Sequence, residues 1–329
     1  MTTTVPKVFA FHEFARVAEA VADHVVHAQN TALEEKEKPS SASASSSIGN
    51  GNSSGHGGLQ GPSSLTNMGN SQHVFRSVST RSLRNGSISQ SKNKKIKERR
   101  FKIAISGGSL IQVLHEGLLK RRDVRWDKWD IYFADERLVP FESPESNYGQ
   151  AKRQIFDMID TEHYGEPNVY HINEALIVDP QECADDYEKA LIRGFAGRDS
   201  VKLPMFDLLL LGCAPDGHIA SLFPNFQESL RERFAWVIPV TNAPSGPPNR
   251  LSLTIPVICH SHQVTFVVEG ATKAPVIKTI MERPEKGLPS SIVNEGAAGR
   301  VSWFVDNDAL TDVMVTKKVY KFLVTNPNV

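Results

Sequence analysis

The chain has 329 residues, of which 40% are hydrophobic and 22% are charged, so it can bury a large core. Its 37 basic and 37 acidic side chains balance to a formal net charge of zero. This balance excludes a positive field over the whole molecule of the kind that attracts nucleic acids or anionic membranes.

Cysteine content and hydropathy bear on where the protein resides. Cys183, Cys213 and Cys259 are odd in number and lack the spacing of metal ligands, which is typical of a reducing compartment. The N-terminal segment carries Glu13 and Arg16 instead of the apolar core of a signal peptide, and no stretch is apolar enough to span a bilayer. We therefore expect a cytoplasmic protein without a membrane segment or a metal site; a nuclear location is also open. We also expect a monomer.

The first predicted elements are a strand over 5–11 and a helix that ends near 33, whose apolar face carries Val17, Val21 and Val25. Residues 34–100 differ in composition, because Ser, Gly and Asn dominate first and Lys and Arg follow. So few apolar side chains cannot offset the entropy of ordering the chain. We predict a long disordered insertion into a surface connection, which loop-closure entropy tolerates well.

Strands and helices alternate from Phe101 onward. This alternation predicts an α/β fold with a mostly parallel, Rossmann-like sheet flanked by helices. Residues 1–33 and 101–329 would then form a single domain around the insertion at 34–100. Strands are predicted over 101–105, 129–137, 168–172, 208–211, 236–240, 250–255, 263–270 and 301–306, and helices over 108–121, 146–159, 181–195 and 271–284.

The strand at 101–105 runs into Ser106-Gly107-Gly108-Ser109. Two glycines and a hydroxyl residue that open a helix bring free backbone N–H groups and the positive helix end to one place, where a phosphate binds well. A plain tight turn explains the same four residues, so the motif alone does not decide between them.

Asp135, Glu136 and Arg137 follow an apolar run at the end of a predicted strand. Such charges are often a solvated strand terminus. The alternative is a ligand site, because the planar fork of donors on an arginine suits phosphate or a developing oxyanion.

The most informative segment is the apolar run 208–211, which leads directly into Gly-Cys-Ala-Pro-Asp-Gly-His. Asp216 and His218 thus follow a buried strand, and α/β folds bind ligands at the carboxyl ends of their strands. A lone histidine is more often structural than catalytic, so its neighbours decide the interpretation. Small and rigid residues around it allow the backbone to approach a ligand closely.

Segments spread along the chain resemble the 6-phosphogluconolactonase family, which is related to the glucosamine-6-phosphate deaminases. The resemblance covers about 8–30 and 101–329 and keeps its order along the sequence. It is carried by Asp135-Glu136-Arg137 with Val139-Pro140, by Ser146-Asn147, by Gly212 and Pro215-Asp216-Gly217-His218 through Ser221-Leu222-Phe223-Pro224, by Arg250, by Gly270-x-x-Lys273-Ala274 and by Trp303-Phe304-Val305-Asp306.

This resemblance implies hydrolysis of 6-phospho-D-glucono-1,5-lactone to 6-phosphogluconate, a step of the pentose phosphate pathway that needs no cofactor and no metal. It makes His218 the general base, Asp216 the residue that orients the site, and Arg137 the group that stabilises negative charge. The substrate contacts that it implies come from Gly107, Gly108, Ser109, Asp135, Asn147, Arg250 and Lys273.

The chain departs from the family pattern at three places. Ala214 replaces the second glycine of Gly-x-Gly-Pro-Asp-Gly-His, Gly246 replaces a lysine before the paired prolines, and Ile219-Ala220 replaces Thr-Cys. A methyl group at 214 is harmful if the position needs a positive φ or a close ligand approach, and is otherwise nearly harmless.

These departures and the Ser-rich insertion resemble the fungal Sol-type members of the family. That group contains working lactonases and paralogues without detectable lactonase activity, and the latter are linked genetically to tRNA nuclear export. The alternative function is therefore a catalytically weak or inactive paralogue that regulates tRNA distribution. The balanced charge argues against direct tRNA binding without excluding it.

An isomerase or deaminase acting on an amino-sugar phosphate is a further enzyme hypothesis. The deaminases follow Asp-Gly-His with a segment that supplies a carboxylate, whereas residues 221–224 supply none. We disfavour this hypothesis for that reason.

The basic stretch 92–100 fits a solvated linker, a nuclear import signal or an arm that contacts RNA. Upstream of it, Arg76 precedes Ser79 by three residues and Arg84 precedes Ser87 by three. That spacing suits basophilic kinases, so Ser79 and Ser87 are predicted phosphorylation sites.

Overall fold

The computed structural model describes residues 6–34, 98–195 and 203–323. Ser79, Ser87 and nearly all of the predicted insertion lie outside the described residues, and so does the basic stretch up to Lys97.

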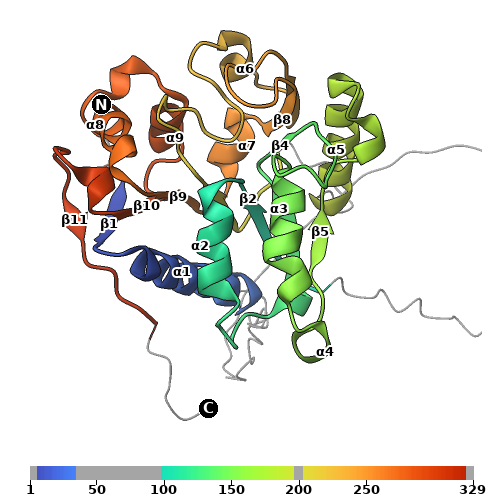
Figure 1. Ribbon diagram of the computed structural model, residues 1–329, viewed down its shortest axis with the longest axis horizontal. Coiled ribbons are helices and arrows are strands. Elements are labelled where there is room, and N and C mark those ends of the chain that lie inside the picture. The colour runs from blue at the N-terminus through green and yellow to red at the C-terminus, as the bar shows by residue number, and fades with distance from the viewer. Residues whose placement is uncertain (1–5, 35–97, 196–202, 324–329) are drawn as a thin grey trace, which may run out of the picture. The chain divides into compact units, whose positions relative to one another are not determined.

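The centre of the fold is an eight-stranded sheet in which all neighbouring strands pair in parallel, as predicted (Figure 1). Its order is β11-β1-β10-β9-β6-β2-β3-β5, so β6 and β2, which precede the two most informative loops, are neighbours in the middle. Their carboxyl ends therefore lie at the same edge of the sheet. The strands are β1 (Lys7–Phe11), β2 (Phe101–Ile105), β3 (Trp129–Phe133), β5 (Asn168–Tyr170), β6 (Leu208–Leu211), β9 (Val264–Val268), β10 (Val301–Asp306) and β11 (Lys317–Lys318).

Helices cover both faces of this sheet, because its central strands are apolar on both sides. On one face α1, α2 and α3 pack over Ile103, Leu210 and Phe304. On the other face α5, α7, α8 and α9 pack with Leu209 and Trp303. The helices are α1 (Phe14–Glu34), α2 (Ser109–Leu118), α3 (Asn147–Gln154), α4 (Thr161–Tyr164), α5 (Pro180–Phe195), α6 (Gln227–Arg231), α7 (Ile255–His260), α8 (Ala274–Glu282) and α9 (Pro289–Gly296).

A second, antiparallel sheet has the order β4-β8-β7 and consists of β4 (Asp135–Arg137), β7 (Val237–Val240) and β8 (Arg250–Leu253). The single strand predicted over 129–137 is therefore wrong, because the chain changes sheets at Ala134. Ala134 donates its backbone N–H to Ile105 of the large sheet at 2.8 Å and accepts from Leu253 of the small sheet at 2.8 Å.

The N-terminal strand is part of the same sheet as the rest, because β1 pairs with β10 and β11. The end of the predicted insertion also needs correction. Arg99 forms an ion pair with Asp207, and Arg100 forms one with Asp130 at 2.5 Å, so these two arginines anchor the chain where it enters β2. Within the described residues, no helix combines the length and apolarity needed to cross a bilayer.

One core contact gives the fold a pH dependence. His24 of α1 is buried, and its Nε2 lies 2.9 Å from the hydroxyl of Thr265 on β9. Burial lowers the pKa of His24 to about 4, and the nearby His27 and Lys7 add to this effect. The folded chain therefore keeps His24 neutral at pH values where the unfolded chain has bound a proton.

We predict that His24→Gln removes part of the acid sensitivity of folding. The contribution of a neutral His24 is present above pH 6.5 and is lost as the pH falls towards 4. The free energy of unfolding of the wild type, relative to the variant, should thus fall by about 2 kcal/mol between pH 8 and pH 5. Urea titrations at both pH values measure this difference, and an unchanged difference would contradict the prediction.

Candidate active site

A cavity of about 270 Å³ lies at the carboxyl edge of the large sheet, where the loops after β2, β6 and β9 meet β4. The structure thus brings together most of the predicted site residues, although they are far apart in the sequence. The cavity is lined by Ser106, Gly107, Gly108, Ser109, Asp135, Arg137, Gly212, Cys213, Ala214, His218, Ile219, Ala220 and Lys273.

The loop between β2 and α2 presents backbone instead of side chains to this cavity. Gly108 precedes the first residue of α2 and has φ of 71°, which favours glycine. A Cβ atom on Gly107 would lie 1.8 Å from Oδ1 of Asn147, a side chain that is fully buried. Glycine at 107 thus lets the loop rest directly on Asn147, with the N-terminus of α2 facing the cavity.

Asp135 joins the two principal loops of the site. Its carboxylate accepts a hydrogen bond from Ser106 Oγ at 2.8 Å and another from Ser221 Oγ at 2.9 Å. Asp135 is only 5% exposed, and both serines are buried as well. Hydrogen bonds to a buried carboxylate are stronger than those between neutral groups, so Asp135 fixes the glycine loop relative to the histidine loop.

Glu136 points the other way and holds the start of α3. Its carboxylate accepts from the backbone N–H groups of Arg137, Asn147 and Tyr148 at 2.7–2.8 Å. Burial raises the pKa of Glu136 to about 7, whereas these three hydrogen bonds act in the opposite direction. Ser146 caps the helix by accepting from the N–H of Gly149.

Asn147 itself does not line the cavity, although the resemblance implied a substrate contact. Its Nδ2 donates to the backbone oxygen of Asp135 at 2.9 Å, and its Oδ1, which has no hydrogen-bond partner, lies under Gly107. The position of Asn147 makes it a support for the glycine loop.

His218 and Asp216 form a compact pair. The Asp216 carboxylate accepts from Nδ1 of His218 at 2.7 Å and from the His218 backbone N–H at 3.1 Å. A carboxylate can only accept, so Nδ1 carries the proton in the neutral ring and Nε2 offers a lone pair. Burial lowers the pKa of His218, and Asp216 opposes this effect in part. The result is a neutral imidazole at neutral pH, as a general base requires.

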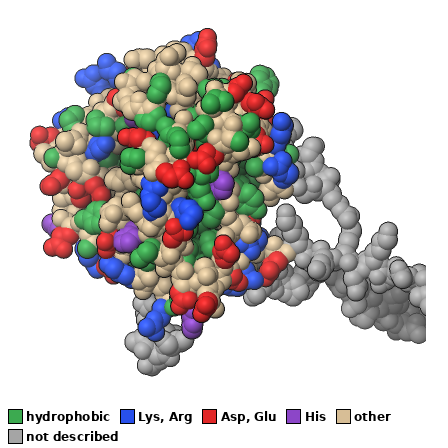
Figure 2. Space-filling model, turned by 45° about the vertical axis from the view of Figure 1, so that its right-hand side comes forward, with side chains coloured by type: hydrophobic (Ala, Val, Ile, Leu, Met, Phe, Trp, Pro, Cys, Tyr) green, Lys and Arg blue, Asp and Glu red, His purple; other side chains and the backbone are tan. Residues whose placement is uncertain are grey.

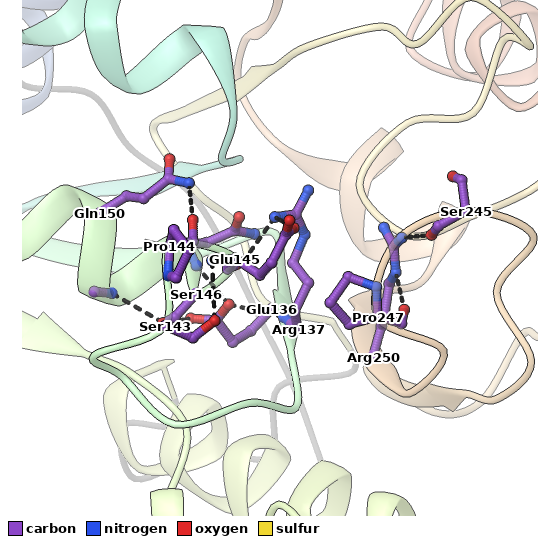
Figure 3. A network of polar contacts seen from close by, with 12 residues as sticks. Glu136, Arg137, Ser143, Pro144, Glu145, Ser146, Gln150, Ser245, Pro247 and Arg250 are labelled. Carbon is purple, nitrogen blue, oxygen red and sulfur yellow. Dashed lines mark hydrogen bonds and ion pairs between the residues drawn. The ribbon is translucent and has the colours of Figure 1, made fainter.

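Three cationic side chains were predicted for the site, and their positions differ. Arg137 and the half-buried Lys273 line the cavity. Arg250 is buried beside it, where its Nε donates to Pro247 at 3.0 Å and its Nη2 donates to Ser245 (Figure 3). The ring of Phe223 contacts both the guanidinium of Arg250, at 5.3 Å, and the ring of His218, at 4.5 Å.

The structure bears on the three departures from the family pattern. Ala214 does not have a positive φ, so its methyl group causes no backbone strain. Ala220, by contrast, has φ of 47°, a conformation that an alanine rarely adopts, and it lines the cavity. Gly246 has φ of 65°, and a Cβ atom there would lie 3.2 Å from Nη2 of Arg250.

Sequence reasoning did not identify some residues of the site. Gly212, Cys213 and Ala220 line the cavity, although no role was predicted for them. Ser221 was noted only as part of a motif, and its hydrogen bond to Asp135 depends on a tertiary contact. Among the described residues, no group of three or more His, Cys, Asp or Glu side chains could hold a metal ion.

The chain is similar in sequence and fold to known proteins. The family model for glucosamine-6-phosphate isomerases/6-phosphogluconolactonase matches residues 78–303. The 6-phosphogluconolactonase-like proteins 1 and 2 of Saccharomyces cerevisiae are 74% and 70% identical over 329 and 333 residues, covering 98% of this chain and of each relative. The solved 6-phosphogluconolactonase from Trypanosoma cruzi shares the fold, with a TM-score of 0.61 at 22% identity over 94% of this chain and 97% of that one.

We predict that Gly107→Ala destabilises the protein whereas Gly212→Ala does not. The first change forces a methyl group against the buried side chain of Asn147, and the second meets no atom within 4 Å. Overpacking of this kind costs about 2 kcal/mol, whereas Gly212→Ala should stay within about 0.5 kcal/mol of the wild type. The free energy of unfolding in urea measures both.

The pair Gly107→Ala and Asn147→Ala provides the control for this mechanism. If the clash with Asn147 causes the loss, the double variant should be less destabilised than the sum of the two single variants. Additive losses, or equal stability of the two glycine variants, would contradict the proposed packing.

Proposed function

Because the chain belongs to the glucosamine-6-phosphate isomerase/6-phosphogluconolactonase family, we propose that it hydrolyses 6-phospho-D-glucono-1,5-lactone to 6-phosphogluconate. The observation that carries this proposal is the His218–Asp216 pair at a cavity that also holds Arg137, Lys273 and a glycine loop. A base, two cations and a helix N-terminus around one cavity suit a neutral ring that carries an anionic phosphate.

In this mechanism, Nε2 of His218 takes a proton from a water molecule as the water oxygen attacks the lactone carbonyl carbon. Asp216 stabilises the imidazolium that forms, since it already accepts from Nδ1. The tetrahedral intermediate carries a negative oxygen, which Arg137 stabilises with its fork of donors. When the ring C–O bond breaks, the imidazolium returns its proton to the leaving oxygen, and the open-chain carboxylic acid that forms releases its remaining proton to solvent to give the carboxylate.

The phosphate of the substrate would bind at the other end of the cavity. Gly107, Gly108 and Ser109 offer backbone N–H groups at the start of α2, and Lys273 supplies a charge from the loop after β9. Arg250 is proposed to act from beside the cavity, where its charge adds to that of Arg137.

The second candidate function is that of a catalytically weak protein that binds the sugar phosphate and regulates tRNA distribution. It is favoured by Gly246, which supplies no cation where the family pattern has a lysine. The face of the molecule in Figure 2 carries acidic and basic side chains intermixed, without a large patch of one sign. Because the net charge of the chain is also zero, an indirect effect on tRNA fits better than direct binding.

Lactone hydrolysis by the purified protein separates the two candidates. We predict turnover above the spontaneous rate and a loss of about 100-fold or more in kcat/KM for His218→Ala, because the general base is removed. Ala214→Gly should change kcat/KM by less than about threefold, because Ala214 has no positive φ that glycine would relieve.

The exposed His262 lies on another loop, so His262→Ala is the matched control and should retain wild-type activity. Hydrolysis no faster than the spontaneous reaction would refute the enzyme function for this chain. Activity that appears only in Ala214→Gly would identify the natural protein as a disabled paralogue.

A further inference from the structure

Two arginines face each other on neighbouring strands of the small sheet, with Arg137 at the cavity and the buried Arg250 beside it. Arg137 on β4 and Arg250 on β8 are directly opposite in the antiparallel register of the small sheet. Like charges in such a pair repel each other. Burial lowers the pKa of Arg250 and Arg137 lowers it further, whereas the carboxylates of Asp135, Glu145 and Asp216 act in the opposite direction. An anion beside the two guanidinium groups would relieve this repulsion.

Glu145 is the carboxylate that pairs with Arg137. Nη1 of Arg137 donates to the backbone oxygen of Glu145 at 2.8 Å and lies 3.6 Å from its carboxylate. Nε of Arg137 is buried and has no hydrogen-bond partner. Figure 3 shows Glu145 against Arg137, with Arg250 on the other side of that arginine.

The segment that carries Glu145 is held from several sides. Arg153 on α3 donates to the backbone oxygen of Phe141 at 2.9 Å and to that of Ser143 at 3.3 Å, and Ser146 is fully buried. The side chain of Glu145 is nevertheless 53% exposed. The backbone oxygen of Glu145 is thus fixed, whereas its carboxylate can rotate away from Arg137 into the solvent at a small cost in free energy.

We propose that Glu145 is a specificity-determining residue: its carboxylate is an internal counterion that competes with the anionic group of a ligand for Arg137. The backbone oxygen of Glu145 keeps the guanidinium in place. The carboxylate of Glu145 is displaced from Arg137 only by a ligand group with a stronger charge or a better hydrogen-bond geometry. Weakly anionic or neutral sugars would therefore gain little from Arg137. This inference deepens the proposed function, because Arg137 is the group proposed to stabilise the oxyanion.

Calorimetric titration of the full chain with 6-phosphogluconate tests the proposal. Glu145→Gln keeps the backbone oxygen and removes only the competing charge, so the Kd should fall about threefold. Glu142→Gln removes the same charge three residues away on an exposed side chain, without a hydrogen bond to Arg137, and should leave the Kd unchanged. In an Arg137→Gln background the effect of Glu145→Gln should disappear.

The same variants titrated with inorganic phosphate keep this test separate from the proposed function. If 6-phosphogluconate does not bind but phosphate binds more tightly to Glu145→Gln than to Glu142→Gln, the lactonase proposal fails and the role of Glu145 stands. Equal affinities of the two glutamate variants for both anions would overturn the role of Glu145. An effect of Glu145→Gln on affinity that persists in the Arg137→Gln background would also overturn this role. The role would be overturned as well if neither anion bound to Glu145→Gln.

Discussion

The arrangement of the site depends on one buried carboxylate. Asp135 accepts hydrogen bonds from Ser106, next to the glycine loop, and from Ser221, three residues after His218. The two loops follow adjacent parallel strands, so the sheet brings them near each other but does not set the distance between them. The buried carboxylate of Asp135 sets that distance. If either serine moved away, its buried hydroxyl would lose its hydrogen bond to Asp135, and an unpaired buried polar group costs free energy.

The strand that carries Asp135 explains why three consecutive charged residues perform three tasks. Side chains alternate between the two faces of a strand. Asp135 and Arg137 therefore line the cavity, whereas Glu136 turns away and binds the N-terminus of α3. Through α3, Glu136 also sets the position of Asn147, on which Gly107 rests. A three-residue strand thus positions Arg137, the glycine loop and the histidine loop together.

Much of the fold and part of the site could be predicted from the sequence. The alternation of strands and helices predicted the parallel sheet, and the glycine loop and the Asp-Gly-His loop were expected at strand ends because apolar runs precede them. The antiparallel sheet was not expected, because β4 has only three residues and reads as the continuation of β3. The buried position of Asn147, the positive φ of Ala220 and the contact of Glu145 with Arg137 all depend on tertiary packing, for which local patterns carry no signal.

The link between the two loops is tested most directly by a double-mutant cycle of Asp135→Asn and Ser221→Ala, with the free energy of unfolding as the measured quantity. If the carboxylate joins the loops as described, the two changes should be coupled by about 1–2 kcal/mol, because each removes the same charged hydrogen bond. Losses that add to within about 0.3 kcal/mol would show that Asp135 and Ser221 act independently, which would contradict this account of the site.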